Sequence, residues 1–197
     1  MDNNKLVLNK PQAVWLAIAN LSTNLMKQTG ALIACNECCD IEENEFIKIA
    51  HDAILRQLLM DIAKFFDRAT TCGNENCSIP MLRELCLSYK DMFTGGEIDS
   101  LIKEIDQLVL KFEDTISKQV RNKKLAHFDL DELFSFNDVQ ISFTSIESLV
   151  VEMGEVISKI GIHLLLIEVK FPSIEEYAVA YKKEVNKLMC LNCNSRT

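Results

Sequence analysis

The 197-residue sequence has few of the residues that interrupt regular structure. It contains six glycines and three prolines, which is too little turn punctuation for a sandwich or barrel of many strands. No apolar run reaches the roughly 20 residues needed to cross a bilayer, since the longest candidate, 160–169, is short and contains Gly161 and His163. The first residues also lack a basic region followed by an apolar signal core. We therefore expect a soluble protein rich in helices, with no membrane partner.

The sequence also contains fewer basic than acidic residues. The formal net charge is -8, which argues against broad electrostatic capture of nucleic acid, so any contact with RNA has to be local. The hydrophobic share of 48% and charged share of 25% are ordinary for a globular chain. We expect one domain, residues 1–197, because a chain of this length can bury a core of its own.

Apolar residues recur at helical spacing along most of the chain. The pattern predicts helices over 11–33, 43–68, 78–89 and from 98 past 120, followed by two more that begin near residues 144 and 174. Two capping boxes, Thr144 with Glu147 and Ser173 with Glu176, support the last two starts. Residues 70–77 are predicted to form a polar loop, and the alternation of Val139, Ile141 and Phe143 indicates a brief extended stretch. The predicted fold class is all-α, a helical bundle of five to six helices.

A local basic segment stands out in this acidic chain. Residues 118–129 read KQVRNKKLAHFD, and no acidic residue occurs between Thr115 and Phe128. Arg121, Asn122 and His127 form the pattern R-x(4–6)-H with a polar neighbour, and the fuller run R-N-x-x-x-A-H-x-D resembles the abortive-infection (Abi U-type) branch of the HEPN superfamily. The resemblance extends to DIAKFFDR at 61–68 and to the Ser-Ile-Pro helix start at 78–80.

The resemblance implies a HEPN-like bundle with metal-independent endoribonuclease activity of the toxin–antitoxin or phage-defence type. It implies Arg121, Asn122 and His127 as catalytic residues at the cleft of a homodimer, RNA as substrate and an antitoxin as a candidate partner. Histidine titrates near neutrality and can accept a proton, while guanidinium stays charged and can bind phosphate oxygens. Lys118, Lys123 and Lys124 are candidate secondary contacts to the substrate. No cofactor is expected.

Two observations oppose this reading. On a continuous α-helix, six residues turn the side chains of Arg121 and His127 about 240° apart, so the helix has to end or bend between them, or a partner has to complete the site. The basic residues could also simply neutralise the carboxyl end of a helix, with His127 as a cap. The alternative function is a noncatalytic helical scaffold or a module that binds a nucleotide or a partner.

Eight cysteines without an export signal favour reduced thiols and a cytoplasmic location. Cys35 with Cys38 and Cys190 with Cys193 have the spacing of zinc ligands, and the two pairs could complete a tetrahedral thiolate site. Cysteines without a metal are the commoner case, and this is the interpretation we favour. Cys72 and Cys77 are expected to be free thiols, and Cys86 is expected in the core.

Overall fold

The structure is a computed structural model that describes residues 8–38, 44–93, 97–116, 142–166 and 168–194. Within these residues the fold is all-α, as predicted, and contains six α-helices. Their bounds are α1 Lys10–Cys38, α2 Glu45–Phe65, α3 Ile79–Ser88, α4 Glu97–Thr115, α6 Phe143–Leu165 and α7 Ile174–Asn194. A short hairpin, β1 Thr70–Thr71 with β2 Asn74–Glu75, and a 3₁₀ turn, η2 Lys90–Met92, complete the described elements.

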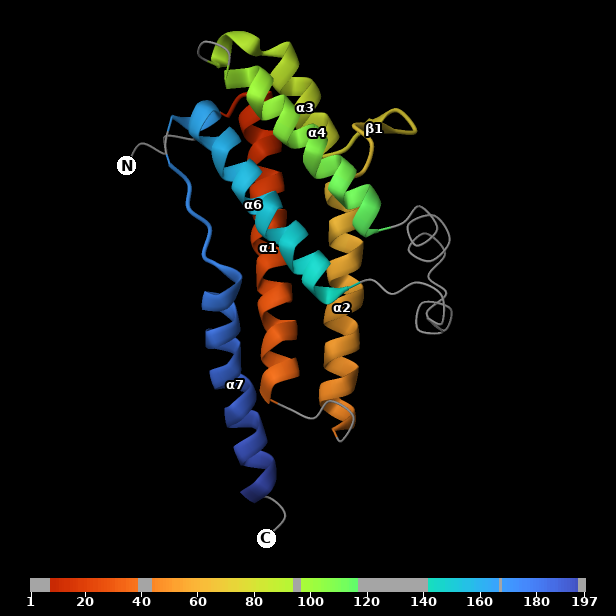
Figure 1. The fold of residues 1–197 in the computed structure, drawn as a ribbon, viewed down its shortest axis with the longest axis vertical. Helices are drawn as coiled ribbons and strands as arrows, with labels where there is room; N and C mark the ends of the chain where they lie inside the picture. Colours follow the sequence, from red (N-terminus) through yellow and green to blue (C-terminus); the bar gives the residue numbers. More distant parts are fainter. Residues whose placement is uncertain (1–7, 39–43, 94–96, 117–141, 167, 195–197) are drawn as a thin grey trace, which may run out of the picture.

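Helix α1 lies at the centre of the bundle. It packs against α2, α3, α6 and α7, while α4 packs against α3 and α6 (Figure 1). In the view of Figure 1, α2 and α7 flank α1 on opposite sides and α6 crosses it diagonally. This position explains why α1 buries residues all along its length, from Trp15 to Cys35.

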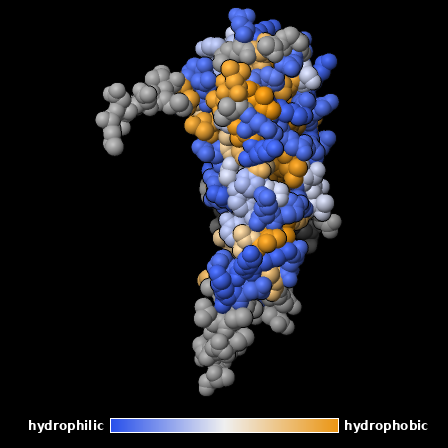
Figure 2. Space-filling view, turned by 90° about the vertical axis from the view of Figure 1, so that its left-hand side faces the viewer, coloured by the Kyte–Doolittle hydropathy of each residue, from blue (hydrophilic) through white to orange (hydrophobic). Residues whose placement is uncertain are grey.

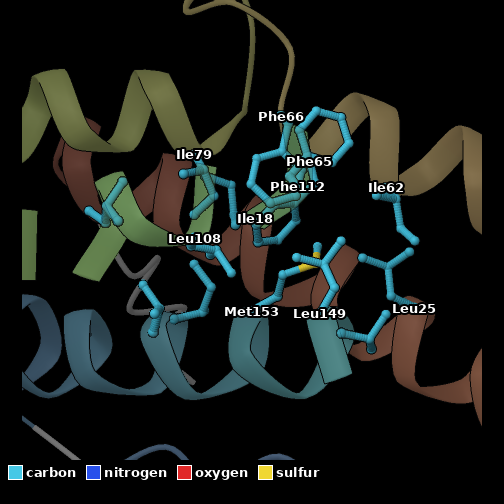
Figure 3. Packing of buried hydrophobic residues seen from close by; sticks show 14 of the residues in the cluster. Ile18, Leu25, Ile62, Phe65, Phe66, Ile79, Leu108, Phe112, Leu149 and Met153 are labelled. Atoms are coloured by element: carbon cyan, nitrogen blue, oxygen red, sulfur yellow. The ribbon is translucent and has the colours of Figure 1, made fainter. Parts of the chain in front are cut away.

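The core joins side chains from α1, α2, α4 and α6 (Figure 3). Phe66, which caps the end of α2, stacks on Phe112 of α4 with ring centroids 4.1 Å apart. Ile18 of α1 and Leu149 of α6 are fully buried in the same cluster. Apolar side chains of this size each contribute about 1.5–3 kcal/mol when they leave water, so this cluster holds the four helices together.

Two glycines let α6 and α7 come close to α1. A Cβ at Gly161 would lie 2.5 Å from Cζ2 of Trp15, whose Nε1 donates a hydrogen bond to the Ile157 carbonyl at 2.8 Å. A Cβ at Gly30 would lie 2.9 Å from the Ala178 nitrogen, so the α1–α7 contact leaves no room for a side chain there. Trp15 is 3% exposed and is therefore a packing residue in the chain described here.

Most helix starts follow the predicted capping chemistry. Ser173 and Glu176 form the predicted capping box, with Ser173 N donating to Glu176 Oε2 at 3.0 Å and Glu176 N donating to Ser173 Oγ at 3.2 Å. Ser78 caps α3 as expected, with Pro80 in the first turn. Asn9 and Gln12 form a similar reciprocal pair at the start of α1.

Three predictions about local structure were wrong. Helix α6 begins at Phe143 with Ser142 at its N-cap, so Thr144 lies inside the first turn and does not cap the helix with Glu147. Phe143 is therefore helical and not extended, while Val139 and Ile141 lie outside the described residues. Helix α4 ends at Thr115 and not beyond Val120. The apolar period misled here because Ile116, just past the helix, is still buried in the core.

The predicted polar loop at 70–77 contains the β1–β2 hairpin. Thr70 pairs with Glu75 and Thr71 with Asn74. Cys72 and Gly73 form the two-residue turn with φ of 51° and 82°, the left-handed values of a type I′ hairpin turn. Glycine supplies one of these positions without strain. The strands are too short for alternation to reveal them in the sequence.

Candidate functional site

The predicted catalytic residues lie between α4 and α6. Arg121, Asn122 and His127 fall within residues 117–141, which are outside the described residues, as do Lys118, Lys123 and Lys124. The structure describes the residues on either side of this segment, which we call the frame. The frame consists of Ile116 after α4 and Ser142 before α6.

The α4 side of the frame is anchored in the core. Ile116 is 1% exposed, and its amide donates a hydrogen bond to the Phe112 carbonyl at 2.8 Å. Phe112 in turn stacks on Phe66 at the end of α2. The last described residue before the motif segment, Ile116, is therefore held by packing close to the carboxyl end of α2.

The α6 side of the frame is tied to α4 by polar contacts. Nζ of Lys111 donates to Ser148 Oγ at 2.8 Å and forms an ion pair with Glu152. The Ser142 carbonyl accepts from the Ile146 amide at 3.2 Å, which starts the helix. Because α4 and α6 pack against each other, the two ends of the motif segment are held on one pair of neighbouring helices.

A buried carboxylate lies on α2 within the run that resembles the HEPN family. Asp61 is 6% exposed and accepts hydrogen bonds from Gln28 Nε2 at 2.9 Å, Gln57 Nε2 at 2.9 Å and Lys64 Nζ at 3.0 Å. Burial opposes its ionisation, but the three hydrogen bonds and the charge of Lys64 outweigh burial and lower the pKa of Asp61. Asp61 therefore stays charged and links α1 to α2.

The two other histidines, His51 and His163, each lie near a carboxylate. His163 of α6 lies against Phe93 with ring centroids 5.6 Å apart, and its Nδ1 is 3.4 Å from Glu97. His51 of α2 lies 3.4 Å from Asp52. Among the described residues, neither histidine belongs to a group of three or more side chains that could hold a metal ion.

The candidate zinc ligands are only partly described. Cys35 is buried and Cys38 half-buried at the end of α1, while the side chains of Cys190 and Cys193 in α7 are outside the described part of the structure. Helix α7 runs beside α1, with Lys182 paired to Glu37. Among the described residues, no group of three or more His, Cys, Asp or Glu side chains could hold a metal ion. Whether the two cysteine pairs meet at a metal therefore depends on side chains outside the described residues.

The remaining described cysteines show contrasting environments. Cys72 and Cys77 are exposed free thiols on and beside the hairpin. Cys86 is buried in α3, as predicted, and burial raises the pKa of its thiol to about 12. A thiol with that pKa stays protonated at neutral pH and is a poor nucleophile.

Sequence reasoning missed a groove between α6, the segment 168–173 and the start of α7. Its volume is about 550 Å³, and Met26, Ile162 and Phe171 contribute to its apolar wall. Figure 2 shows apolar surface in the upper half of this side of the molecule and mainly hydrophilic surface below. The apolar residues between two predicted helices, Val169 and Phe171, were the available signal. The described lining of the groove comes from α1, α6, the segment 168–173 and the start of α7.

Comparison with known proteins places the chain in a family. The family model HEPN_AbiU2, described as AbiU2, matches residues 37–184, which is more than half of the chain. The match covers α2 to α6 and the segment with Arg121 and His127. No curated protein and no solved structure matches the chain. None of the helices in the described ranges is long and apolar enough to span a membrane.

Proposed function

Because the chain belongs to the HEPN_AbiU2 family, we propose that it is a metal-independent endoribonuclease of the HEPN toxin or phage-defence type. The observation that carries this proposal is the pattern Arg121-Asn122…His127 inside the matched residues. RNA is the proposed substrate, and the proposed cellular setting is the cytoplasm, with an antitoxin as a partner that restrains the activity.

The proposed reaction needs a base and a cation. His127 accepts the proton of a 2′-hydroxyl, and the 2′-oxygen attacks the adjacent phosphorus. Arg121 stabilises the negative charge that develops on the phosphorane oxygens. The bond from phosphorus to the 5′-oxygen then breaks, and the leaving oxygen takes a proton. The products are a 2′,3′-cyclic phosphate and a 5′-hydroxyl, so the reaction requires no metal or redox step.

Helix geometry sets a condition on this proposal. A helix continuing through residue 127 would hold Arg121 and His127 on different faces. Helix α4 ends at Thr115, before either residue, so α4 does not impose that separation. We further propose that two copies of the motif meet in a homodimer, with Asn122 orienting the catalytic pair. Lys118, Lys123 and Lys124 supply local positive charge for RNA in a chain of net charge -8.

The net charge of -8 also supports a second candidate function. A noncatalytic HEPN-like scaffold, or a module that binds a nucleotide or a partner, needs no strong attraction for RNA. The family match fits this candidate equally well, because the fold by itself does not determine activity.

The test compares the purified chain with the variant His127→Gln on RNA, in excess chelator. We expect the wild-type protein to release fragments ending in 2′,3′-cyclic phosphate and the variant to lose at least a hundredfold in rate. His163→Gln is the matched control, since His163 contacts Phe93 and Glu97 and should leave cleavage intact. Equal cleavage by wild type and His127→Gln, or none by either, would favour the scaffold.

A further inference from the structure

Helix α2 carries apolar side chains on the face that points away from the core. Phe46 is 70% exposed and Ile49 61% exposed, Ala53 is exposed, and Met60 is half-buried. Spacings of three, four and seven residues place these four on one side of the helix, which we call the outer stripe. The opposite face of α2 is already buried through Leu58, Ile62 and Phe65.

The outer stripe is separate from the other exposed apolar surface among the described residues, the groove to which Val151 and Ile162 of α6 contribute. Leu110 of α4 and Val179 of α7 are exposed singly, as is normal for a protein surface. A helix that is apolar on opposite sides is usually covered on both of them. In the part of the chain described here, α2 lies at the edge of the bundle with α1 as its main neighbour (Figure 1).

We propose that the outer stripe is the surface on which a second copy of the chain docks, with the two α2 helices antiparallel and a two-fold axis beside Ala53. Phe46 lies seven residues before Ala53 and Met60 seven residues after it. Rotation about this axis therefore brings Phe46 of one protomer to the partner subunit's Met60. The small side chain of Ala53 permits close approach where the helices cross.

Charge on the flank of the stripe is self-complementary in this arrangement. Asp52 and Arg56 are one helical turn apart and half-buried. With the two-fold axis beside Ala53, the Asp52 carboxylate of each protomer lies within reach of the long side chain of the partner subunit's Arg56, which gives two symmetric ion pairs. Pairs of this kind contribute modestly to affinity but select the orientation and register of an interface.

This inference rests on the homodimer in the proposed function and adds the surface that forms it. The first test measures the mass of the full chain in solution by light scattering. We expect a dimer for the wild type, and for Ala53→Asp and Ile49→Asp a dissociation constant raised about a hundredfold. Leu110→Asp, an equally exposed apolar position on α4, is the matched control and should stay dimeric. Circular dichroism confirms that each variant is folded.

The second test addresses the register. Asp52→Lys places an ammonium group against the guanidinium of the partner subunit's Arg56, and Arg56→Glu places a carboxylate against that of the partner subunit's Asp52. Each variant alone should therefore dimerise about tenfold more weakly than wild type. An equimolar mixture of the two variants restores opposite charges at both pairs of the heterodimer and should recover near wild-type affinity. Any effect of a substitution within its own chain is present both in the single-variant sample and in the mixture. Recovery of affinity in the mixture therefore reports the contact between the two chains.

The outcomes separate this inference from the proposed activity. A wild-type dimer that survives Ala53→Asp and Ile49→Asp, or a mixture that fails to recover, overturns the α2 surface while leaving RNA cleavage by His127 untouched. A monomeric wild type, including one whose stripe is covered by another part of the chain or by a different protein, also overturns it. The cleavage assay then decides the proposed function by itself.

Discussion

At the scale of single residues, Asp61 shows how a buried charge is maintained. Three donors hold its carboxylate, and their combined effect lowers its pKa below the ordinary value of 3.8 in spite of burial. A depressed pKa means that the folded state binds this proton less tightly than the unfolded state. The stabilisation is therefore fully present above pH 3.8 and is lost as the pH falls through the lower, folded-state pKa.

Asp61→Asn should lower the free energy of unfolding by about 1–3 kcal/mol at pH 7, because it removes the charge from three hydrogen bonds. The difference from wild type should shrink as the pH falls below about 4. Urea unfolding at several pH values measures both effects. Asp114→Asn, at an exposed position on α4, is the control and should change stability little at any pH. A difference that stays constant down to about pH 3 would contradict the assignment.

The cysteines allow a second prediction at this scale. With a pKa of about 12, the Cys86 thiol has a thiolate fraction of about 10⁻⁴ at pH 8 and is also buried. Iodoacetamide should label the exposed Cys72 and Cys77 in the folded protein and spare Cys86 until denaturant is added. Mass spectrometry of peptides measures the labelling. Rapid modification of Cys86 under native conditions would show that α3 opens readily.

At the scale of elements, the crossing of α1 and α6 depends on glycine. The Trp15 ring is fixed by its hydrogen bond to the Ile157 carbonyl, so a methyl group at Gly161 would overlap the ring. At Gly154 the nearest atom is the terminal methyl of Met26, the movable end of a flexible side chain.

Gly161→Ala should therefore cost about 1–3 kcal/mol of stability from overpacking. Gly154→Ala is the matched variant and should stay within about 1 kcal/mol of wild type, because the gain in helix propensity offsets the shift of Met26. Trp15 is the single tryptophan, so its fluorescence during urea unfolding measures both variants. Equal stabilities for the two variants would show that the ring can move aside.

Helix positions could be predicted from the sequence because periodicity and capping agree over most of the chain. The Ser173–Glu176 box is confirmed, whereas the same pattern at Thr144 and Glu147 failed because Ser142 and the apolar Phe143 already start the helix. The end of α4 was misplaced because a buried side chain such as Ile116 continues the apolar period beyond the helix.

The candidate site and the outer stripe were harder to predict from the sequence than the helices. Arg121 and His127 were found by motif, and their relative placement stays a prediction. The outer stripe was missed because the sequence marks Phe46 and Ile49 as apolar without telling which face of α2 the bundle covers. Burial depends on the arrangement of all helices, which local patterns do not determine.

At the scale of the whole molecule, the residues that the family model matches do not include the whole helical bundle. The matched residues begin at Glu37, yet most of α1 precedes that residue and α1 is the helix that contacts α2, α3, α6 and α7. A fragment lacking residues 1–36 would expose the core-facing sides of all four.

We expect a chain that begins at Glu37 to lose cooperative thermal unfolding and most of its helical circular dichroism signal. A chain that begins at Leu8 is the control and should unfold like the full-length protein, since it keeps all of α1. If the shorter fragment melts cooperatively, α1 is an addition to the bundle and not its centre.

The central place of α1 also has a consequence for synthesis. Its partners α6 and α7 lie more than a hundred residues later in the chain. A ribosome makes α1 before α6 and α7, so the apolar sides of α1 stay uncovered until those two helices emerge. Contacts between such distant segments slow folding. The newly made chain should therefore depend on chaperones until α6 and α7 have been synthesised.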